Sequence, residues 1–266
     1  YTSVAYLVAG HEVVSGGVLG SDAWSFISRM KLLADYFPKY PFWNSLEGGG
    51  VSLLYGYPPF IHTLIIFTAR VLNWTLVEAL KFWEFTSVVI FAFGIFVYAW
   101  VRFRIAVVSF LAGLFFVISP IAWMWMFEWG FVAEQIAAMF FPFTVLFVDL
   151  FLLQAIEGNW SLKTRLYLFL TVLFLGLSAL SHPFVFTGVL SFALVYGIII
   201  AIFRKKAKLK SLLKVFALTF SLLALTTLAF GFWLIPFYEY TVLANSSSGQ
   251  ASRPPVSTDY QERDML

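Results

Sequence analysis

The chain has 266 residues, of which 61% are hydrophobic and 12% charged, with a formal net charge of +3 and a mean hydropathy of +0.87. Soluble domains carry about a quarter charged residues, so this composition excludes an ordinary water-soluble protein. The sequence has no cysteine, which excludes disulfides, thiol nucleophiles and Cys-ligated metals. We therefore predict an integral membrane protein whose partners include membrane lipids and no nucleic acid.

The first part of the chain is an apolar stub followed by a long polar stretch. Residues 1–9 are expected to be the end of a first transmembrane helix, and the chain is expected to be a fragment or a processed product. Residues 10–72 are predicted to form an outer loop with an amphipathic run from Ser25 to Tyr36. Ile61 to Leu72 is too short to cross a bilayer, so we predict an interfacial or re-entrant helix that begins after Pro58-Pro59.

Residues 73–238 contain apolar segments of the length that a membrane-crossing helix needs, roughly 20 residues. The predicted spans are Thr75 to Val101, Ile105 to Ser119, Phe131 to Ile156, Leu166 to Ser181, Phe184 to Phe203 and Leu212 to Ile235. Residues 239–266 turn polar and are predicted to be an outer tail or linker. The predicted fold class is all-α: a polytopic transmembrane helical bundle with a long first outer loop that carries juxtamembrane amphipathic helices.

Basic residues predict the orientation, because Lys and Arg concentrate in short cytoplasmic loops. They fall in alternate connections, at residues 102–104, 163–165 and 204–210. This pattern places the loop 10–72 and the connection 120–130 on the opposite, outer face. We accordingly expect a multi-pass protein of the plasma membrane whose active face is outside the cytoplasm.

Asp22 is the first candidate functional residue, because it puts a carboxylate next to the membrane face just before the amphipathic run. Asp in that place is also a common helix N-cap. Ser21 offers a hydroxyl that can cap the helix instead, which would leave Asp22 free to act as a base or to bind a metal.

A series of short motifs runs through the outer loop: Gly20, Asp22, Trp43, Gly48 to Gly50, Tyr55, Tyr57, Pro58 and Pro59. Their order resembles the start of the GT-C membrane glycosyltransferases. Within that group the chain is similar to the membrane proteins named for a 6-pyruvoyl-tetrahydropterin synthase-related domain. The later segments Ile118-Ser119-Pro120 and Phe232 to Pro236 also match, so the resemblance extends over nearly the whole chain.

The resemblance implies transfer of a sugar from a polyprenyl-phosphate donor to a glycan, lipid or protein acceptor on the outer face. It also implies an acid in the first outer loop, which Asp22 supplies, and a second acid from the next outer loop. Glu128 is our candidate for the second acid, ahead of Glu134. Many members pair two acids at the first position, whereas Asp22 stands alone here. Binding of a divalent cation, Mg²⁺ or Mn²⁺, by Asp22 therefore stays an open prediction, and so does retained catalysis.

Sugar transfer from a phosphate also needs groups that stabilise the charge developing on the leaving phosphate. The candidates for substrate or phosphate binding are Arg29, Lys31, His62, His182, Tyr57 and Arg253. Arg29 and Lys31 are equally consistent with the wet face of an amphipathic helix. His182 precedes Pro183 and is equally consistent with a helix end.

A different function class also fits the sequence: a transporter, or a lipid-handling or scaffold protein without covalent chemistry. Such a protein would place polar groups deep in the membrane and interrupt helices at matched positions in two halves. Asp149 lies inside a predicted span near its cytoplasmic end, on the wrong side for the outer site. We expect it to hydrogen-bond between helices or to reach the interface.

Overall fold

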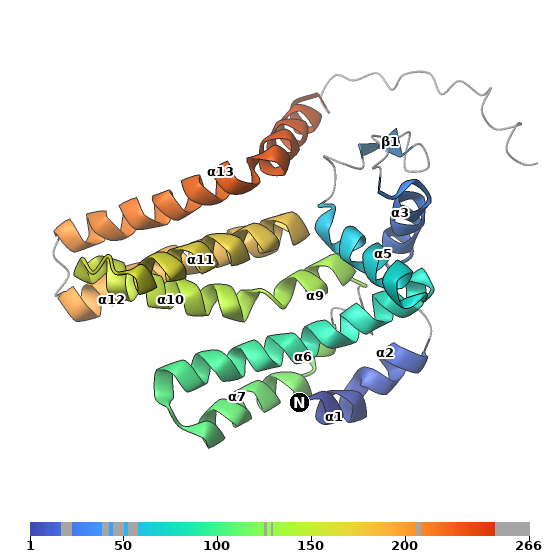
Figure 1. Cartoon of the computed structure of the whole chain (residues 1–266), viewed down its shortest axis with the longest axis horizontal. Coiled ribbons are helices and arrows are strands. Elements are labelled where there is room, and N and C mark those ends of the chain that lie inside the picture. Colours follow the sequence, from blue (N-terminus) through green and yellow to red (C-terminus); the bar gives the residue numbers. More distant parts are fainter. Residues whose placement is uncertain are drawn as a thin grey trace, which may run out of the picture.

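The computed structural model describes residues 1–16, 23–38, 43–44, 51–52, 58–124, 127–128, 130–205 and 209–247. Within these ranges the chain is almost entirely helical. Figure 1 shows the long helices running alongside one another, with α3, α5 and β1 gathered at one end of the bundle.

The N-terminal part consists of short helices and one pair of very short strands. The elements are α1 (Thr2–Ala5), η1 (Tyr6–Gly10), α2 (His11–Ser15), α3 (Ala23–Tyr36), β1 (Trp43–Asn44), β2 (Val51–Ser52) and α5 (Phe60–Leu72). The strands pair antiparallel, with Trp43 opposite Ser52 and Asn44 opposite Val51. The sequence predicts an amphipathic helix before residues 39–57 and a short helix after them. Both are present, as α3 and α5.

The bundle itself is built from longer helices. They are α6 (Leu76–Phe103), α7 (Ala106–Ile118), α8 (Ile121–Met124), α9 (Val132–Ala138), α10 (Phe141–Glu157), α11 (Leu162–Ser181), α12 (Pro183–Lys205) and α13 (Leu209–Ser247). Four segments of the described chain are long and apolar enough to cross a membrane: Leu76–Phe103, Val132–Glu157, Leu162–Ser181 and Leu212–Pro236. The composition and these segments together define a helical membrane protein.

The ends of these helices follow from local sequence. Thr75 and Glu78 form a capping box at the start of α6: the Glu78 amide donates to Thr75 Oγ1 at 3.2 Å, and the Thr75 amide donates to Glu78 Oε2 at 2.7 Å. Helix α10 ends at Glu157, and the next residue, Gly158, has a φ of 83°, a left-handed conformation that glycine adopts without a steric penalty.

Two predicted spans differ from the observed helices. The segment Ile105 to Ser119 contains only the 13-residue helix α7, about 20 Å long at 1.5 Å per residue, against a hydrocarbon core of about 30 Å. The segment Phe131 to Ile156 is interrupted between α9 and α10. Pro142 explains the interruption, because proline has no amide hydrogen to donate and its ring clashes with the carbonyl four residues earlier.

Helix α13 is longer than the sequence predicts. It continues through Pro236 to Ser247, so residues 239–247 of the predicted polar tail are helical, while residues 248–266 lie outside the described ranges. A proline inside a helix removes one backbone hydrogen bond and favours a bend. Figure 1 shows α13 changing direction toward its C-terminal end.

The connections whose basic residues predict the orientation lie at one end of the bundle. The turn between α6 and α7, the turn between α10 and α11, the end of α12 and the start of α13 all lie at the end away from α3 and α5 (Figure 1). These places carry Arg104, Lys163 and Lys205. The helices therefore alternate as predicted, whereas the assignment of this end to the cytoplasm remains a prediction.

Helix α3 is held on α5 by a buried apolar layer. Ala23, Phe26, Met30 and Leu33 recur at helical spacing on one face of α3, and all four are buried in a cluster that also contains residues of α5, α6 and α9. At the far end of this layer the Arg70 guanidinium donates to the carbonyl of Ala34 at 2.8 Å. This packing fixes the position of the side chains that α3 turns toward α9.

Candidate functional site

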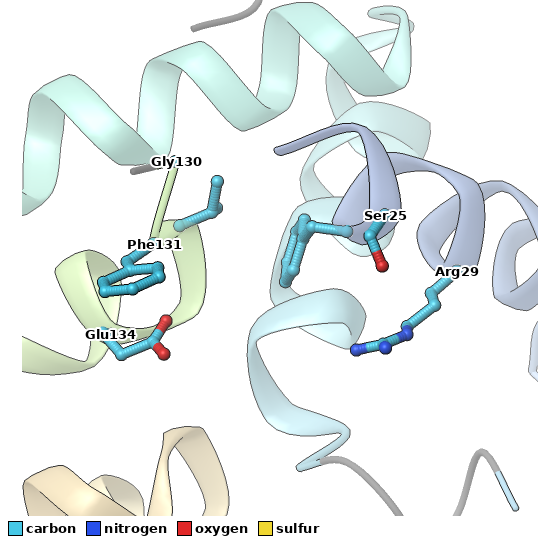
Figure 2. A pocket seen from close by; sticks show the side chains of 7 residues that line it. Ser25, Arg29, Gly130, Phe131 and Glu134 are labelled. Carbon is cyan, nitrogen blue, oxygen red and sulfur yellow. The ribbon is translucent and has the colours of Figure 1, made fainter. Parts of the chain in front are cut away.

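A polar cavity of about 300 Å³ lies between the first two turns of α3 and the start of α9. The α3 side of the cavity is formed by Ser25, Phe26 and Arg29, and the other side by Gly130, Phe131, Val132 and Glu134. Figure 2 shows the Arg29 guanidinium and the Glu134 carboxylate extending into this space from opposite walls. The cavity thus carries a cationic wall and an acidic wall.

The acidic wall depends on a tight turn just before α9. Gly130 has a φ of 68°, and its carbonyl accepts a hydrogen bond from the Val132 amide at 2.8 Å. Between them Phe131 has φ −75° and ψ 64°, the conformation of an inverse γ-turn. This turn sets the direction of α9 and places Glu134 in the first turn of the helix, facing the cavity.

Glu134 is held by a histidine from another part of the chain. His182 Nε2 lies 3.0 Å from Glu134 Oε1, and the exposed fractions of the two side chains are 8% and 23%. His182 lies between α11 and α12, where its backbone is extended and its amide donates to the Ser178 carbonyl at 2.8 Å. The imidazole therefore holds one oxygen of the Glu134 carboxylate.

The cationic wall consists of Arg29 and the first turn of α3. Arg29 is half-buried, and Ser25 lies one turn before it on the same face of the helix. The amide groups at a helix N-terminus carry a partial positive charge that favours a nearby anion. An anionic group such as a phosphate is therefore favoured on the α3 side of the cavity.

His62 lies under this wall rather than in the cavity. Its ring is stacked on Phe26, with 4.2 Å between ring centroids and an interplanar angle of 20°. Burial lowers the pKa of His62 to about 3; a backbone hydrogen bond at Pro58 acts in the opposite direction, and the charge of Arg29 lowers the pKa further. His62 is thus neutral near pH 7, so it supports the cationic wall by packing and adds no charge of its own.

The structure brings together only some of the residues that the sequence singles out. Arg29 lines the cavity and His182 contacts it through Glu134, whereas Lys31 and Glu128 are exposed and do not line it. Asp22, Tyr57 and Arg253 lie outside the described residues. In the sequence Asp22 directly precedes Ala23, the first residue of α3.

From the sequence, Glu128 is the preferred candidate for the second acid, ahead of Glu134. The structure places Glu134 in the cavity instead. Its sequence signal is a carboxylate among the apolar residues Val132, Ala133 and Ile136. The structure buries all three, and an acid in such a setting needs a partner. Its partner His182 is 48 positions further along the chain, and no spacing rule connects the two.

No group of three or more His, Asp or Glu side chains suited to a metal ion occurs among the described residues. The predicted Mg²⁺ or Mn²⁺ depends on Asp22, which lies outside them. A role for a divalent cation consequently stays a prediction for that residue alone.

A second polar cluster lies in the membrane-length part of the bundle, at the C-terminal end of α6. Asp149 of α10 is fully buried, and its Oδ2 lies 3.1 Å from Arg102 Nε. The Tyr196 hydroxyl of α12 donates to Asp149 Oδ1 at 2.6 Å. The expected hydrogen bond between helices at Asp149 is confirmed, and this cluster joins α6, α10 and α12 away from the cavity.

Comparison with known proteins adds no relative: no family model matches the chain, and neither a curated protein nor a solved structure matches it significantly. The class that the fold and the cavity define is a polytopic helical membrane protein with a charged cavity at one end of the bundle.

Proposed function

We propose that this protein is a membrane glycosyltransferase of the GT-C type, which moves a sugar from a polyprenyl-phosphate donor to an acceptor on the outer face of the membrane. The observation that carries the proposal is the opposition of Arg29 and Glu134 across one cavity at the end of an apolar helical bundle. A phosphate-linked sugar requires this combination: positive charge at the phosphate and a carboxylate at the attacking hydroxyl.

The proposed reaction is a displacement at the anomeric carbon of the sugar. The acceptor oxygen forms a bond to that carbon, and the bond between the carbon and the phosphate oxygen breaks. The electron pair of that bond leaves with the phosphate, beside Arg29 and the start of α3. The proton of the acceptor hydroxyl passes to a carboxylate, a general-base role that typically contributes about 10²- to 10⁴-fold in rate.

Two carboxylates are candidates for the base. Glu134 faces the cavity and is oriented by His182. Asp22 adjoins α3 in the chain and is the acid that the family resemblance singles out, either as the base or as the ligand of a divalent cation. In our proposal Glu134 takes the role of second acid predicted for Glu128, and Asp22 keeps its predicted role as base or metal ligand.

Sugar transfer in membranes supplied with radiolabelled polyprenyl-phosphate sugars tests this function. The variants are Asp22→Asn and Glu134→Gln, with Glu128→Gln as the matched control because Glu128 is exposed and outside the cavity lining. The proposal expects transfer by the parent and by Glu128→Gln, with a fall of about 10²-fold or more in the other two variants.

Two results would redirect the assignment. Loss of transfer in Glu128→Gln alone would return the second acid to the original prediction. No transfer by the parent across a broad panel of donors would favour the alternative, a transporter or a lipid-handling or scaffold protein. The fully buried Asp149, paired with Arg102, is the observation consistent with that alternative, because charged groups inside a bundle are frequent in transport pathways.

A further inference from the structure

An apolar groove follows the seam between α12 and α13. Its outer part is a cavity of about 480 Å³ whose lining includes Pro183, Phe186 and Thr187 of α12 with Thr227, Leu234 and Ile235 of α13. A second cavity, of about 270 Å³, follows along the same two helices and includes Leu190, Leu194, Phe216, Thr219 and Leu223.

The two cavities lie on one stripe of each helix. On α12 the lining positions 183, 187, 190, 191 and 194 recur every three or four residues, and positions 216, 219, 220, 223 and 227 do the same on α13. The helices run antiparallel, so the cavities follow each other along the seam. From residue 183 to residue 194 the groove measures about 17 Å at 1.5 Å per residue, roughly half of a 30 Å hydrocarbon core.

The groove begins next to the acidic wall of the polar cavity. Pro183 lines the groove, and the preceding residue, His182, contacts the Glu134 carboxylate at 3.0 Å. A molecule whose apolar part lies in the groove would therefore have its polar part at the end nearest His182, the partner of Glu134. The cationic Arg29 wall lies on the far side of the polar cavity.

We infer that the groove holds the apolar chain of a lipid acceptor, a membrane lipid whose head group offers a free hydroxyl to Glu134. The inference rests on the proposed function and selects one acceptor class from the glycan, lipid and protein acceptors that the sequence leaves open. The length of one leaflet fits a lipid chain that enters from the membrane. The placement beside the base fits the molecule that loses a proton, rather than the donor that carries the leaving phosphate.

Photo-crosslinking tests the groove independently of sugar transfer. The chain is placed in vesicles that contain diazirine-tagged phosphatidylinositol or phosphatidylglycerol, whose head groups carry free hydroxyls, or tagged phosphatidylcholine, which has none. We expect residues 183–194 and 216–238 to be labelled about tenfold more by the hydroxylated lipids, because the Glu134 carboxylate accepts a hydrogen bond from them. Glu134→Gln should reduce that preference.

Thr227→Trp should fill the groove and abolish the labelling, and Thr187→Trp serves as a second variant because Thr187 is exposed. Leu228→Trp is the matched control: Leu228 is adjacent in the same helix, is 81% exposed and lines neither cavity. Equal labelling by phosphatidylcholine would identify ordinary surrounding lipid and overturn the inference. Competition by unlabelled polyprenyl phosphate would assign the groove to the donor and overturn it as well.

The two proposals fail in distinguishable ways. Selective labelling of the groove without sugar transfer to any acceptor would retain the lipid site and reject the glycosyltransferase. Transfer whose labelled product partitions into water, with no selective labelling of the groove, would retain the enzyme and reject the lipid acceptor.

Discussion

His182 Nε2 lies 3.0 Å from Glu134 Oε1, and this contact joins the turn between α11 and α12 to the first turn of α9. Neither residue belongs to a recognisable local motif, yet together they give the cavity an oriented carboxylate. Because His182 acts through Glu134 and does not line the cavity, it is a positioning residue.

The first prediction concerns this contact. A hydrogen bond to a charged group contributes about 1.5–3 kcal/mol, so His182→Ala should lower kcat for sugar transfer by roughly 10- to 100-fold with little change in the KM for the donor. His182→Gln retains an N–H donor and should restore most of the rate. Equal losses of rate in both variants, with unchanged protein yield, would show that His182 does not orient Glu134.

The second prediction concerns the pair of Arg102 and Asp149, in which the Asp149 side chain is fully buried and the Arg102 side chain is 30% exposed. Removing one partner of such a pair strands a buried charge at a cost of about 3–5 kcal/mol. Arg102→Met should therefore lower the thermal midpoint in detergent more than the double variant Arg102→Met with Asp149→Leu. Arg104→Met provides a control in which an exposed arginine of the same end is removed. A double variant no more stable than Arg102→Met would contradict the prediction.

The third prediction concerns Arg70, which donates to the Ala34 carbonyl at 2.8 Å and lies 4.8 Å from the centre of the Phe37 ring. A hydrogen bond and an exposed cation–π contact together contribute about 1–2 kcal/mol to the docking of α3 on α5. The chain contains no cysteine, so Leu33→Cys, on the buried face of α3, can report on this docking through its rate of maleimide labelling.

Arg70→Met should raise the labelling rate of Leu33→Cys by about 5- to 30-fold if opening of α3 limits the reaction. An exposed cysteine on the same helix, Ser28→Cys, should react equally fast in both backgrounds. An unchanged rate at Leu33→Cys would show that the apolar layer alone holds the helix.

The fourth prediction is a pH dependence of stability. The pKa of His62 is about 3 in the folded protein and near 6.5 in an unfolded chain, so below pH 6.5 the unfolded state binds the extra proton. The neutral, buried His62 therefore contributes fully to the free energy of unfolding above pH 6.5. That contribution declines as the pH falls toward 3, because the unfolded state is then stabilised by protonation. Between pH 7 and pH 5 the loss is about 2 kcal/mol. Thermal midpoints measured at both pH values should differ less in His62→Phe than in the parent.

The sequence predicts the elements whose signal is local. The amphipathic spacing of α3 and the apolar lengths of α6, α11 and α13 each depend on neighbouring residues, and the structure contains these helices. Counting apolar residues predicts the length of a membrane segment but not whether its helix is continuous. Pro142 interrupts the helix in a segment whose hydropathy is continuous.

The candidate site could be predicted only in part, because its geometry depends on contacts between distant residues. The position of Arg29 follows from its place on α3, but the choice between Glu128 and Glu134 depends on the γ-turn at Phe131 and on a histidine from another helix connection. The spacing of Glu128 and Glu134 in the sequence does not determine which of them lines the cavity.

The last prediction tests the orientation that the proposed function requires. The ends of α6, α10 and α12, where the basic residues that predict the orientation occur, lie at the end of the bundle away from α3 (Figure 1), and the positive-inside rule assigns that end to the cytoplasm. Ser28→Cys on α3 and Asn159→Cys in the turn between α10 and α11 are both exposed and lie at opposite ends. In intact cells an impermeant maleimide should label Ser28→Cys at once and Asn159→Cys only after permeabilisation. The reverse pattern would place the charged cavity in the cytoplasm, where a polyprenyl-phosphate sugar presented on the outer leaflet has no access to Glu134.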